Sequence, residues 1–252
     1  MTAFPLRRLA LTAALAPLAL GLASCKEKAA DGAAPSGAPI AKIAAPAGKA
    51  WGDVITVTPE GGYLMGNPDA PIKVIEYGSL TCPHCAEFAE AAATELRDNF
   101  VASGRVSFEF RNFIRDAIDL TATQLTQCGS PESFFALTDQ VFANQKSFFD
   151  KAQGAGKAAQ DAAFNQEPAK RGPAIGELTG LTEFFAARGI AKDQANACLA
   201  DTAKAEAMAA RVTKQADQYQ ITGTPTFLLN GKKLDYNTWP ELKADLEKAG
   251  AR

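Results

Sequence analysis

The stretch Cys82-Pro83-His84-Cys85 decides the fold of this 252-residue chain and carries its chemistry. An apolar run before it, over residues 72–77, is typical of a buried strand. The residues after it, 86–100, repeat apolar side chains with the period of one helix face: Phe88, Ala92, Leu96 and Phe100. The cysteines are therefore predicted to lie where a strand ends and a helix begins. Pro83 suits the first helical position, because it has no N–H to leave unpaired and its φ is already helical.

This position predicts a reactive thiol at Cys82. The residue would cap the helix, and the free N–H groups of the first turn, with the positive end of the helix dipole, favour a thiolate there. A protonated His84 would add a second positive charge. A stable thiolate, which appears as a lowered pKa of Cys82, stabilises the reduced pair and so makes the disulfide oxidising. Cys85 lies within reach across the first turn and is expected to be the less exposed sulfur.

Two other uses of a Cys-x-x-Cys pair are less consistent with the sequence. Zinc needs three or four protein ligands, but the one histidine of the chain is His84 itself and no second Cys-x-x-Cys exists. A purely structural disulfide over this spacing at a helix start would be strained and labile. We therefore expect redox chemistry at Cys82 and Cys85, with no metal site and no bound cofactor.

Two motifs together resemble the DsbA family of thiol–disulfide oxidoreductases. The first is Ile75-Glu76-Tyr77, the end of the predicted strand, leading into Cys82-Pro83-His84-Cys85, and the second is Ile221-Thr222-Gly223-Thr224-Pro225-Thr226-Phe227. The resemblance covers about residues 53–250. It implies an α/β, thioredoxin-like fold with an inserted α-helical domain.

The elements predicted along the chain agree with that fold. Residues 51–116 are expected to form the first half of the thioredoxin fold, 117–219 the helical insertion and 220–252 the second half. The strands expected are 53–58, 72–77, 106–110, 226–229 and 233–235, and the helices after the active-site helix are 118–127, one from 130 onward, 178–188, 192–199, 202–219 and 238–249.

The resemblance also assigns roles around the cysteine pair. The matching proline of the family is cis and lies against the cysteines, so Pro225 is expected to be cis. It would turn the backbone of Thr224 toward an extended substrate strand, with room provided by Gly223. Glu76 matches an acid that lies beneath the active site in the family, where a buried carboxyl group with a raised pKa could move the Cys85 proton. The alternative is that Glu76 faces solvent.

Cys128 and Cys198 both fall within the predicted insertion. In a cytosolic protein they would be buried apolar residues, whereas spare cysteines in an exported protein often pair. Some DsbA relatives from alphaproteobacteria have a second disulfide within the helical domain, so the resemblance implies a structural Cys128–Cys198 bridge. The sequence alone does not fix this connectivity.

The N-terminal sequence indicates export. A short basic start and an apolar run over residues 9–22 predict a signal peptide over 1–25 rather than a membrane span. Leu22-Ala23-Ser24-Cys25 resembles a bacterial lipobox, in which the cysteine is lipidated; an ordinary signal peptide is the alternative. Residues 26–50 are mostly Ala, Pro and Gly without a hydrophobic period, and they are expected to form a disordered tether.

These features predict a protein disulfide oxidoreductase that oxidises cysteine pairs in unfolded or reduced exported proteins. It would be periplasmic, either soluble or anchored through lipid on Cys25 to one of the two membranes. The family implies reoxidation by a quinone-linked membrane thiol oxidase. A net charge of −2 and the lack of basic stretches interleaved with aromatic residues predict no nucleic-acid partner.

Two alternative functions stay open from the sequence. A disulfide isomerase or reductase on the same frame would fit Thr224, because such relatives often have threonine before the cis proline. Isomerases of the family, however, carry a long N-terminal dimerisation module that residues 26–50 cannot supply. A lipid-tethered metal chaperone could instead bind a soft ion through Cys82 and Cys85. The resting redox state of the pair and metal analysis of the reduced protein would separate these functions.

Overall fold

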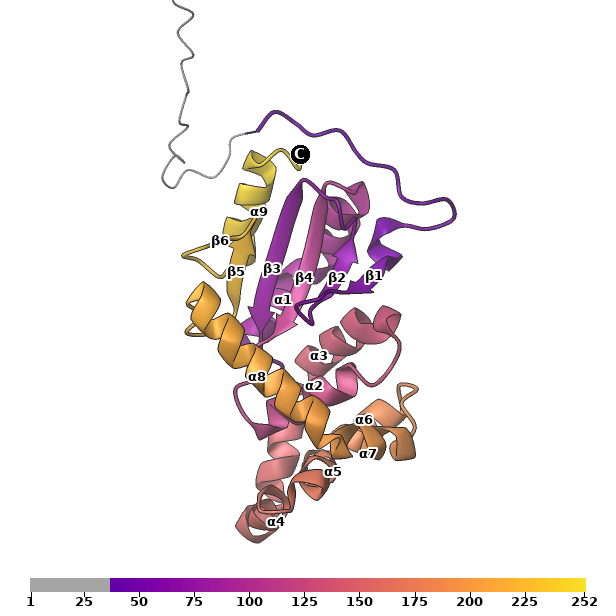
Figure 1. Ribbon diagram of the computed structural model, residues 1–252, viewed down its shortest axis with the longest axis vertical. Helices are drawn as coiled ribbons and strands as arrows, with labels where there is room; N and C mark the ends of the chain where they lie inside the picture. Colours follow the sequence, from indigo (N-terminus) through magenta and orange to yellow (C-terminus); the bar gives the residue numbers. More distant parts are fainter. Residues whose placement is uncertain (1–36) are drawn as a thin grey trace, which may run out of the picture. The chain divides into compact units, whose positions relative to one another are not determined.

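The computed structural model describes residues 37–252, so the predicted signal peptide, Cys25 and residues 26–36 of the predicted tether lie outside it. A six-stranded mixed sheet in the order β1-β2-β4-β3-β5-β6 forms its centre (Figure 1). Only β3 and β4 pair in parallel. The strands are β1 (Ile55–Val57), β2 (Tyr63–Gly66), β3 (Ile72–Gly78), β4 (Val106–Asn112), β5 (Thr226–Leu229) and β6 (Lys232–Lys233). This is the expected thioredoxin-like sheet.

Helices cover both faces of the sheet because β3 is apolar on both sides. α1 (Pro83–Glu95) and α9 (Trp239–Lys248) share the main core with Ile72 and Val74. Side chains alternate along a strand, so Tyr77 points to the opposite face. There it packs with the C-terminal part of α8 (Thr202–Tyr219), which crosses in front of the sheet in Figure 1.

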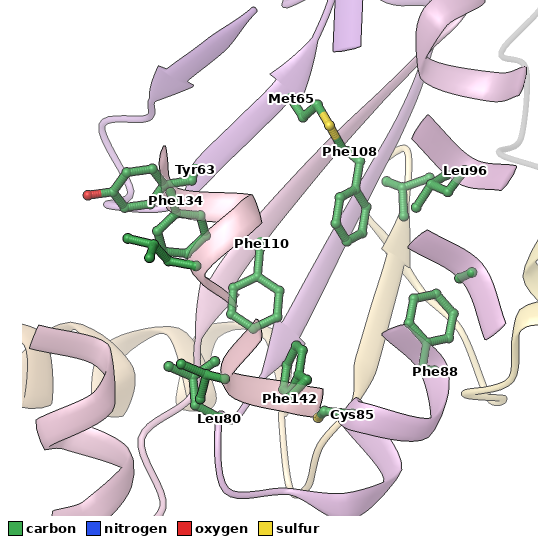
Figure 2. Close-up of a cluster of buried hydrophobic side chains, with 14 of the residues drawn as sticks. Tyr63, Met65, Leu80, Cys85, Phe88, Leu96, Phe108, Phe110, Phe134 and Phe142 are labelled. Atoms are coloured by element: carbon green, nitrogen blue, oxygen red, sulfur yellow. The ribbon is translucent and has the colours of Figure 1, made fainter. Parts of the chain in front are cut away.

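Aromatic rings fill the main core and connect the sheet to the inserted domain (Figure 2). Phe110 on β4 lies 6.0 Å from Phe134 and 6.1 Å from Phe142, measured between ring centroids, and the latter two come from the insertion. Burial of one such side chain contributes roughly 1.5–3 kcal/mol. The thioredoxin-like part and the insertion therefore share one core, and Cys85 lies within it.

The insertion consists of helices that follow β4 and return to β5. It lies at the end of the sheet where β3 and β4 finish, the same end at which α1 begins (Figure 1). No helix within residues 37–252 is long and apolar enough to cross a membrane. Its helices are α2 (Ala117–Thr126), α3 (Phe134–Gly154), α4 (Gly156–Phe164), α5 (Pro168–Thr179), α6 (Leu181–Ala186), α7 (Lys192–Ala200) and α8.

Some local predictions were wrong. β2 was not predicted, because its four residues stand between glycine-rich segments; its backbone pairs with β1 and β4, and distant pairing leaves no local pattern. The helix predicted over 178–188 begins only at α6, because Gly180 takes a left-handed φ of 73° and ends α5. The return strand is β6 rather than 233–235.

The tether prediction was also wrong for residues 37–50, which lie along the folded domain. The N–H of Gly37 donates to the carbonyl oxygen of Lys248 at 2.8 Å, and the N–H of Ile40 donates to that of Gly250 at 2.9 Å. Such backbone hydrogen bonds require no hydrophobic periodicity in the sequence, so composition did not predict them.

Candidate functional site

Cys82 and Cys85 lie at the start of α1 as two free thiols. Cys82 occupies the N-cap position and Pro83 is the first residue of the helix, as the sequence predicted. Cys85 is 0% exposed and Cys82 is 3% exposed. Figure 2 shows Cys85 beside Phe142 at the edge of the aromatic core. The first sulfur is thus close to the surface and the second is enclosed.

The two sulfurs differ sharply in acidity. The pKa of Cys82 is lowered to about 5, chiefly by a hydrogen bond from the Cys85 thiol. Burial acts in the opposite direction, but the Thr224 hydroxyl and the backbone N–H groups of Cys85 and His84 also favour the thiolate. Burial and the bond to Cys82 raise the pKa of Cys85 far above its ordinary value. At neutral pH the pair is therefore a thiolate at Cys82 and a thiol at Cys85.

His84 acts on this thiolate through its backbone. Its imidazole is exposed, and Nδ1 lies 2.9 Å from Glu87 Oε2, which raises the pKa of His84. The positive charge that the sequence predicted to favour the Cys82 thiolate is therefore paired with the carboxylate of Glu87. The backbone N–H of His84, a group of the helix N-terminus, favours the Cys82 thiolate directly.

The loop before β5 lies against Cys82. The Thr224–Pro225 peptide bond is cis, and the carbonyl oxygen of Thr224 is 3.3 Å from Cys82 Sγ. Thr224 Oγ1 is buried and has no other hydrogen-bond partner among the described residues, so its hydroxyl is available to the Cys82 thiolate. A Cβ atom added at Gly223 would meet nothing within 4 Å, so the surface is open there. The structure thus brings Thr224 and Pro225 to the reactive sulfur and leaves space beside them.

Glu76 faces the core and not solvent. The residue is 3% exposed, and Oε1 is buried without a hydrogen-bond partner among the described residues. Burial, followed by the negative charges of Asp139 and Cys82, raises the pKa of Glu76 well above its usual range. Its charge would in turn raise the pKa of Cys85. A neutral carboxyl group near the buried sulfur can donate a proton to a Cys85 thiolate, and the carboxylate that remains can accept one in the reverse direction.

Two residues that sequence reasoning missed hold the active-site loop, residues 79–82, which joins β3 to α1. Asp119 on α2 accepts hydrogen bonds from Ser79 Oγ at 2.6 Å and from the N–H of Leu80 at 2.9 Å. The signal for Asp119 was a carboxyl group with the helical spacing of the buried Ala122 and Leu125.

Gln145 on α3 contacts the same loop from the other side. Its Nε2 donates to the carbonyl oxygen of Leu80 at 2.9 Å and to that of Cys82 at 3.0 Å. The sequence carried no signal for Gln145, because a polar residue on a long helix ordinarily faces solvent.

Cys128 and Cys198 form a disulfide in the insertion, with an S–S distance of 2.01 Å and a sequence separation of 70. It connects the chain just after α2 to α7. The amide of Gln194 donates to the carbonyl oxygen of Cys128 at 3.1 Å, and that of Gln124 donates to the carbonyl oxygen of Cys198 at 3.1 Å. Among the residues described, no group of three His, Cys, Asp or Glu side chains could hold a metal ion.

Known proteins resemble this chain over most of the described residues. A family model described as "Thioredoxin" matches residues 58–248. A Rickettsia bellii protein named "Putative protein-disulfide oxidoreductase" is 25% identical over 190 residues, which cover 75% of this chain and 65% of that protein. The chain thus spans less than two thirds of that relative's length.

Solved structures also match this fold. A crystal structure described as a protein-disulfide isomerase from Novosphingobium aromaticivorans superimposes with a TM-score of 0.69 at 32% identity, covering 73% of this chain and 94% of the other. The alpha-DsbA1 of Wolbachia pipientis superimposes with a TM-score of 0.61 at 23% identity, covering 77% and 92%. The similarity to the Wolbachia pipientis protein shows a shared fold.

Proposed function

The chain belongs to the thioredoxin family, as a DsbA-like member with an inserted helical domain, and on this basis we propose that it catalyses thiol–disulfide exchange with cysteine-containing proteins through Cys82 and Cys85. The observation that carries the proposal is the asymmetry of the pair. Cys82 has a pKa lowered to about 5 at the start of a helix, and burial raises the pKa of its enclosed partner Cys85.

The asymmetry supports oxidation of substrates as the direction of exchange. A thiolate of low pKa is a good leaving group, and its stability in the reduced protein makes the disulfide oxidising. In the first step a substrate thiolate bonds to Cys82 Sγ, the Cys82–Cys85 bond breaks, and its electron pair stays on Cys85. In the second step another substrate thiolate attacks the substrate sulfur and releases Cys82 as its thiolate. The substrate has then lost two electrons and the protein has gained them.

Glu76 is proposed to supply the proton that the Cys85 thiolate takes up. Its carboxyl group is buried, and burial raises its pKa well above the usual range, which favours the protonated acid that this step needs. Transfer of this proton would leave a buried carboxylate. Uptake of a proton from solvent would then restore the neutral acid.

Thr224 is proposed to bind the substrate chain. Its carbonyl oxygen lies beside the sulfur that the substrate attacks, and the space at Gly223 leaves room for an extended segment. Backbone hydrogen bonds to such a segment would depend little on its sequence. This arrangement would suit an enzyme that acts on many unfolded proteins.

The test is oxidative refolding of a reduced, unfolded protein that needs disulfides for activity. Oxidised protein in stoichiometric amount should restore activity and end as a dithiol, whereas Cys82→Ser should restore none above the buffer control. The equilibrium of the Cys82–Cys85 pair with glutathione should show an oxidising disulfide. Failure of the wild type to oxidise the substrate would contradict the proposal.

Isomerisation or reduction is the second candidate, favoured by the relative from Novosphingobium aromaticivorans, which is described as a protein-disulfide isomerase. Refolding of a substrate with scrambled disulfides separates the two directions. An isomerase would restore its activity when added as the dithiol. An oxidase would act on the reduced substrate when added as the disulfide.

The place of action is proposed to be the periplasm, with lipid on Cys25 as an anchor and a quinone-linked membrane thiol oxidase as the reoxidising partner. The first support is the sequence of the N-terminal segment, which is typical of an export signal. The second is that disulfides form and persist in oxidising compartments such as the periplasm. Replacement of Cys25 by Ser should move the protein from the membrane fraction to the soluble periplasmic fraction.

A further inference from the structure

A buried carboxyl group beside the active site has no part in the steps above. Asp119 is 0% exposed and lies on α2, in the inserted domain. Its Oδ2 accepts a hydrogen bond from Ser79 Oγ at 2.6 Å, and its Oδ1 accepts one from the N–H of Leu80 at 2.9 Å. The carboxyl group therefore fixes the two loop residues that lead toward Cys82.

The hydrogen-bond partners of Asp119 suit a carboxylate better than an amide. The N–H of Arg115 also donates to Oδ2, at 3.0 Å, so the three partners of the group are all donors. An asparagine amide in the same place would turn its NH₂ toward at least one of these donors in either orientation. Burial raises the pKa of Asp119 to about 7, while the bonds from Ser79, Arg115 and Leu80 favour the ionised form.

The residue that Asp119 holds most closely also contacts the buried sulfur. The backbone N–H of Ser79 donates to Cys85 Sγ at 3.5 Å. Burial raises the pKa of Cys85, and the Ser79 N–H acts in the opposite direction. Because apolar side chains surround this sulfur, a donor at this point stabilises the negative charge that appears on it when the disulfide opens.

We propose that Asp119 is a positioning residue for thiol–disulfide exchange, which holds the Ser79 N–H against the Cys85 sulfur. The inference deepens the proposed function and rests on it for its biological meaning. In the step concerned, an incoming thiolate bonds to Cys82 Sγ, the Cys82–Cys85 bond breaks, and the electron pair remains on Cys85 until that sulfur takes a proton. Asp119 acts on this leaving thiolate through Ser79.

The same loop has further contacts with the insertion, which fit a positioning role. Gln145 donates to the carbonyl oxygens of Leu80 and Cys82, and Thr81 Oγ1 donates to Asp116 Oδ2 at 2.8 Å. Asp116 caps α2 by accepting from the N–H of Asp119 at 2.8 Å. Side chains of α2, its cap and α3 thus fix the loop, and of these Asp119 is the one that accepts a hydrogen bond from Ser79, the residue that donates to Cys85.

The experiment measures how fast reduced glutathione opens the oxidised Cys82–Cys85 pair, with acid quenching and mass spectrometry. Asp119→Asn should slow this step roughly tenfold, as expected for weakening one hydrogen bond to a charged group. The equilibrium constant with glutathione should change less than about twofold, because Cys85 is a neutral thiol in the product. The titration midpoint of Cys82 should not move, because none of the groups that favour its thiolate is hydrogen-bonded to Asp119.

Two more variants separate positioning from general stability. Gln124→Ala removes two hydrogen bonds that α2 makes to the carbonyl oxygens of Cys198 and Asp201, away from the active-site loop. It should lower the free energy of unfolding without slowing the reaction. Ser79→Ala removes the hydroxyl that Asp119 accepts from while keeping the backbone N–H, so it should slow the step less than Asp119→Asn does.

In the double variant Ser79→Ala with Asp119→Asn, the two effects on the opening rate should be less than additive. Adding Ser79→Ala to Asp119→Asn should slow the reaction less than Ser79→Ala slows it in wild type, because both changes act on one contact. Equal opening rates for wild type and Asp119→Asn would overturn the inference. A slow rate accompanied by a shifted Cys82 midpoint, or matched by Gln124→Ala, would overturn it as well. If Asp119→Asn does not fold, an unchanged opening rate in Ser79→Ala would overturn the inference in its place.

Failure of the proposed function has a different signature. Glutathione opens any accessible disulfide, so the rate effect is measurable whichever proteins the enzyme acts on. A wild type that reacts with glutathione but neither oxidises nor rearranges a protein substrate would contradict the proposed function. The effect of Asp119 on the opening rate would then still stand.

Discussion

The sulfur of Cys82 lies 3.3 Å from the backbone carbonyl oxygen of Thr224. Thr224 therefore contributes two groups to the site, its carbonyl oxygen and its hydroxyl, and the hydroxyl lowers the pKa of Cys82. A residue far along the sequence thus contributes to the acidity of the thiol at the start of α1. Substitutions at Thr224 can separate the two contributions, because only the side chain changes.

Thr224→Val should make the disulfide less oxidising. The substitution keeps the shape of the side chain but removes the hydroxyl donor to the thiolate, so the pKa of Cys82 should rise by up to about one unit, the effect of roughly one hydrogen bond. The glutathione equilibrium should shift toward the disulfide in parallel. Thr224→Ser, which keeps the hydroxyl, is the matched control. A Val variant with the wild-type equilibrium constant would show that the hydroxyl does not act on the thiolate.

The Cys82 thiol of the reduced wild type should titrate with a midpoint of about 5. Absorbance of the thiolate against pH measures it, and Cys85 does not interfere because its pKa is raised. The hydrogen bond from Cys85 is the largest cause of the low value, so Cys85→Ala should titrate higher than wild type, with Cys85→Ser between them. A wild-type midpoint near 8 or above, the range of a free cysteine, would contradict the proposed oxidising function.

The acidity of Cys82 should also appear in the pH dependence of stability. Its pKa is about 5 in the folded reduced protein against an ordinary value of 9.0. The thiolate therefore stabilises the reduced fold fully above pH 9, and this contribution is lost as the pH falls through about 5. Urea unfolding of reduced wild type and reduced Cys82→Ser should show a difference in unfolding free energy that grows from pH 5 to 9. Oxidised wild type, which has no thiol at this position, supplies the control.

Glu76→Gln should slow exchange and leave its equilibrium unchanged. The amide preserves the shape and neutrality of the buried acid but cannot transfer a proton to Cys85. Because the pKa of Glu76 is raised well above 4.5 in the folded state, this group makes wild type lose stability as the pH rises from 4.5 toward the raised pKa, whereas the variant has no such loss. Stopped-flow exchange measures the first effect, and urea unfolding at a series of pH values above 4.5 measures the second. Wild-type exchange rates in Glu76→Gln would remove this residue from the mechanism.

Features with local causes could be predicted from the sequence. The cap at Cys82 with Pro83 after it, the bounds of α8 and the strand β5 all follow from residues within a few positions of one another. The strand β2 could not be predicted in this way, because its four residues are stabilised by pairing with β1 and β4. Residues 37–50 escaped prediction for the same reason, since their partners lie near the C-terminus and after α1.

Some residues of the candidate site could likewise be predicted from local sequence, whereas others depend on contacts between distant segments. Cys82, Cys85 and Pro225 were identified from two short motifs, and the structure brings them together. Asp119 and Gln145 act on the active-site loop only because the insertion folds back against it, across 39 and 65 residues of chain. A buried position for Glu76 could be inferred from its apolar strand, but the missing partner of Oε1 depends on the packing around it.

The disulfide between Cys128 and Cys198 should stabilise the insertion without taking part in exchange. It closes a loop with a sequence separation of 70, for which chain-entropy arithmetic gives about 4 kcal/mol. Cys128→Ser with Cys198→Ser should lower the unfolding free energy by up to that amount. The hydrogen bonds from Gln124 and Gln194 to the two cysteine carbonyl groups remain in the variant and keep part of the junction in place.

This bridge should also be harder to reduce than the active-site pair. Neither of its sulfurs is stabilised as a thiolate by a helix start with proline at the first position, which is the arrangement that makes Cys82 a good leaving group. Mild reduction of the oxidised protein followed by alkylation and mass spectrometry should label Cys82 and Cys85 but leave Cys128 and Cys198 joined. The variant Cys82→Ser with Cys85→Ser should keep this bridge intact under the same conditions. Alkylation of Cys128 or Cys198 before any reductant is added would show that the two residues are thiols in the folded protein.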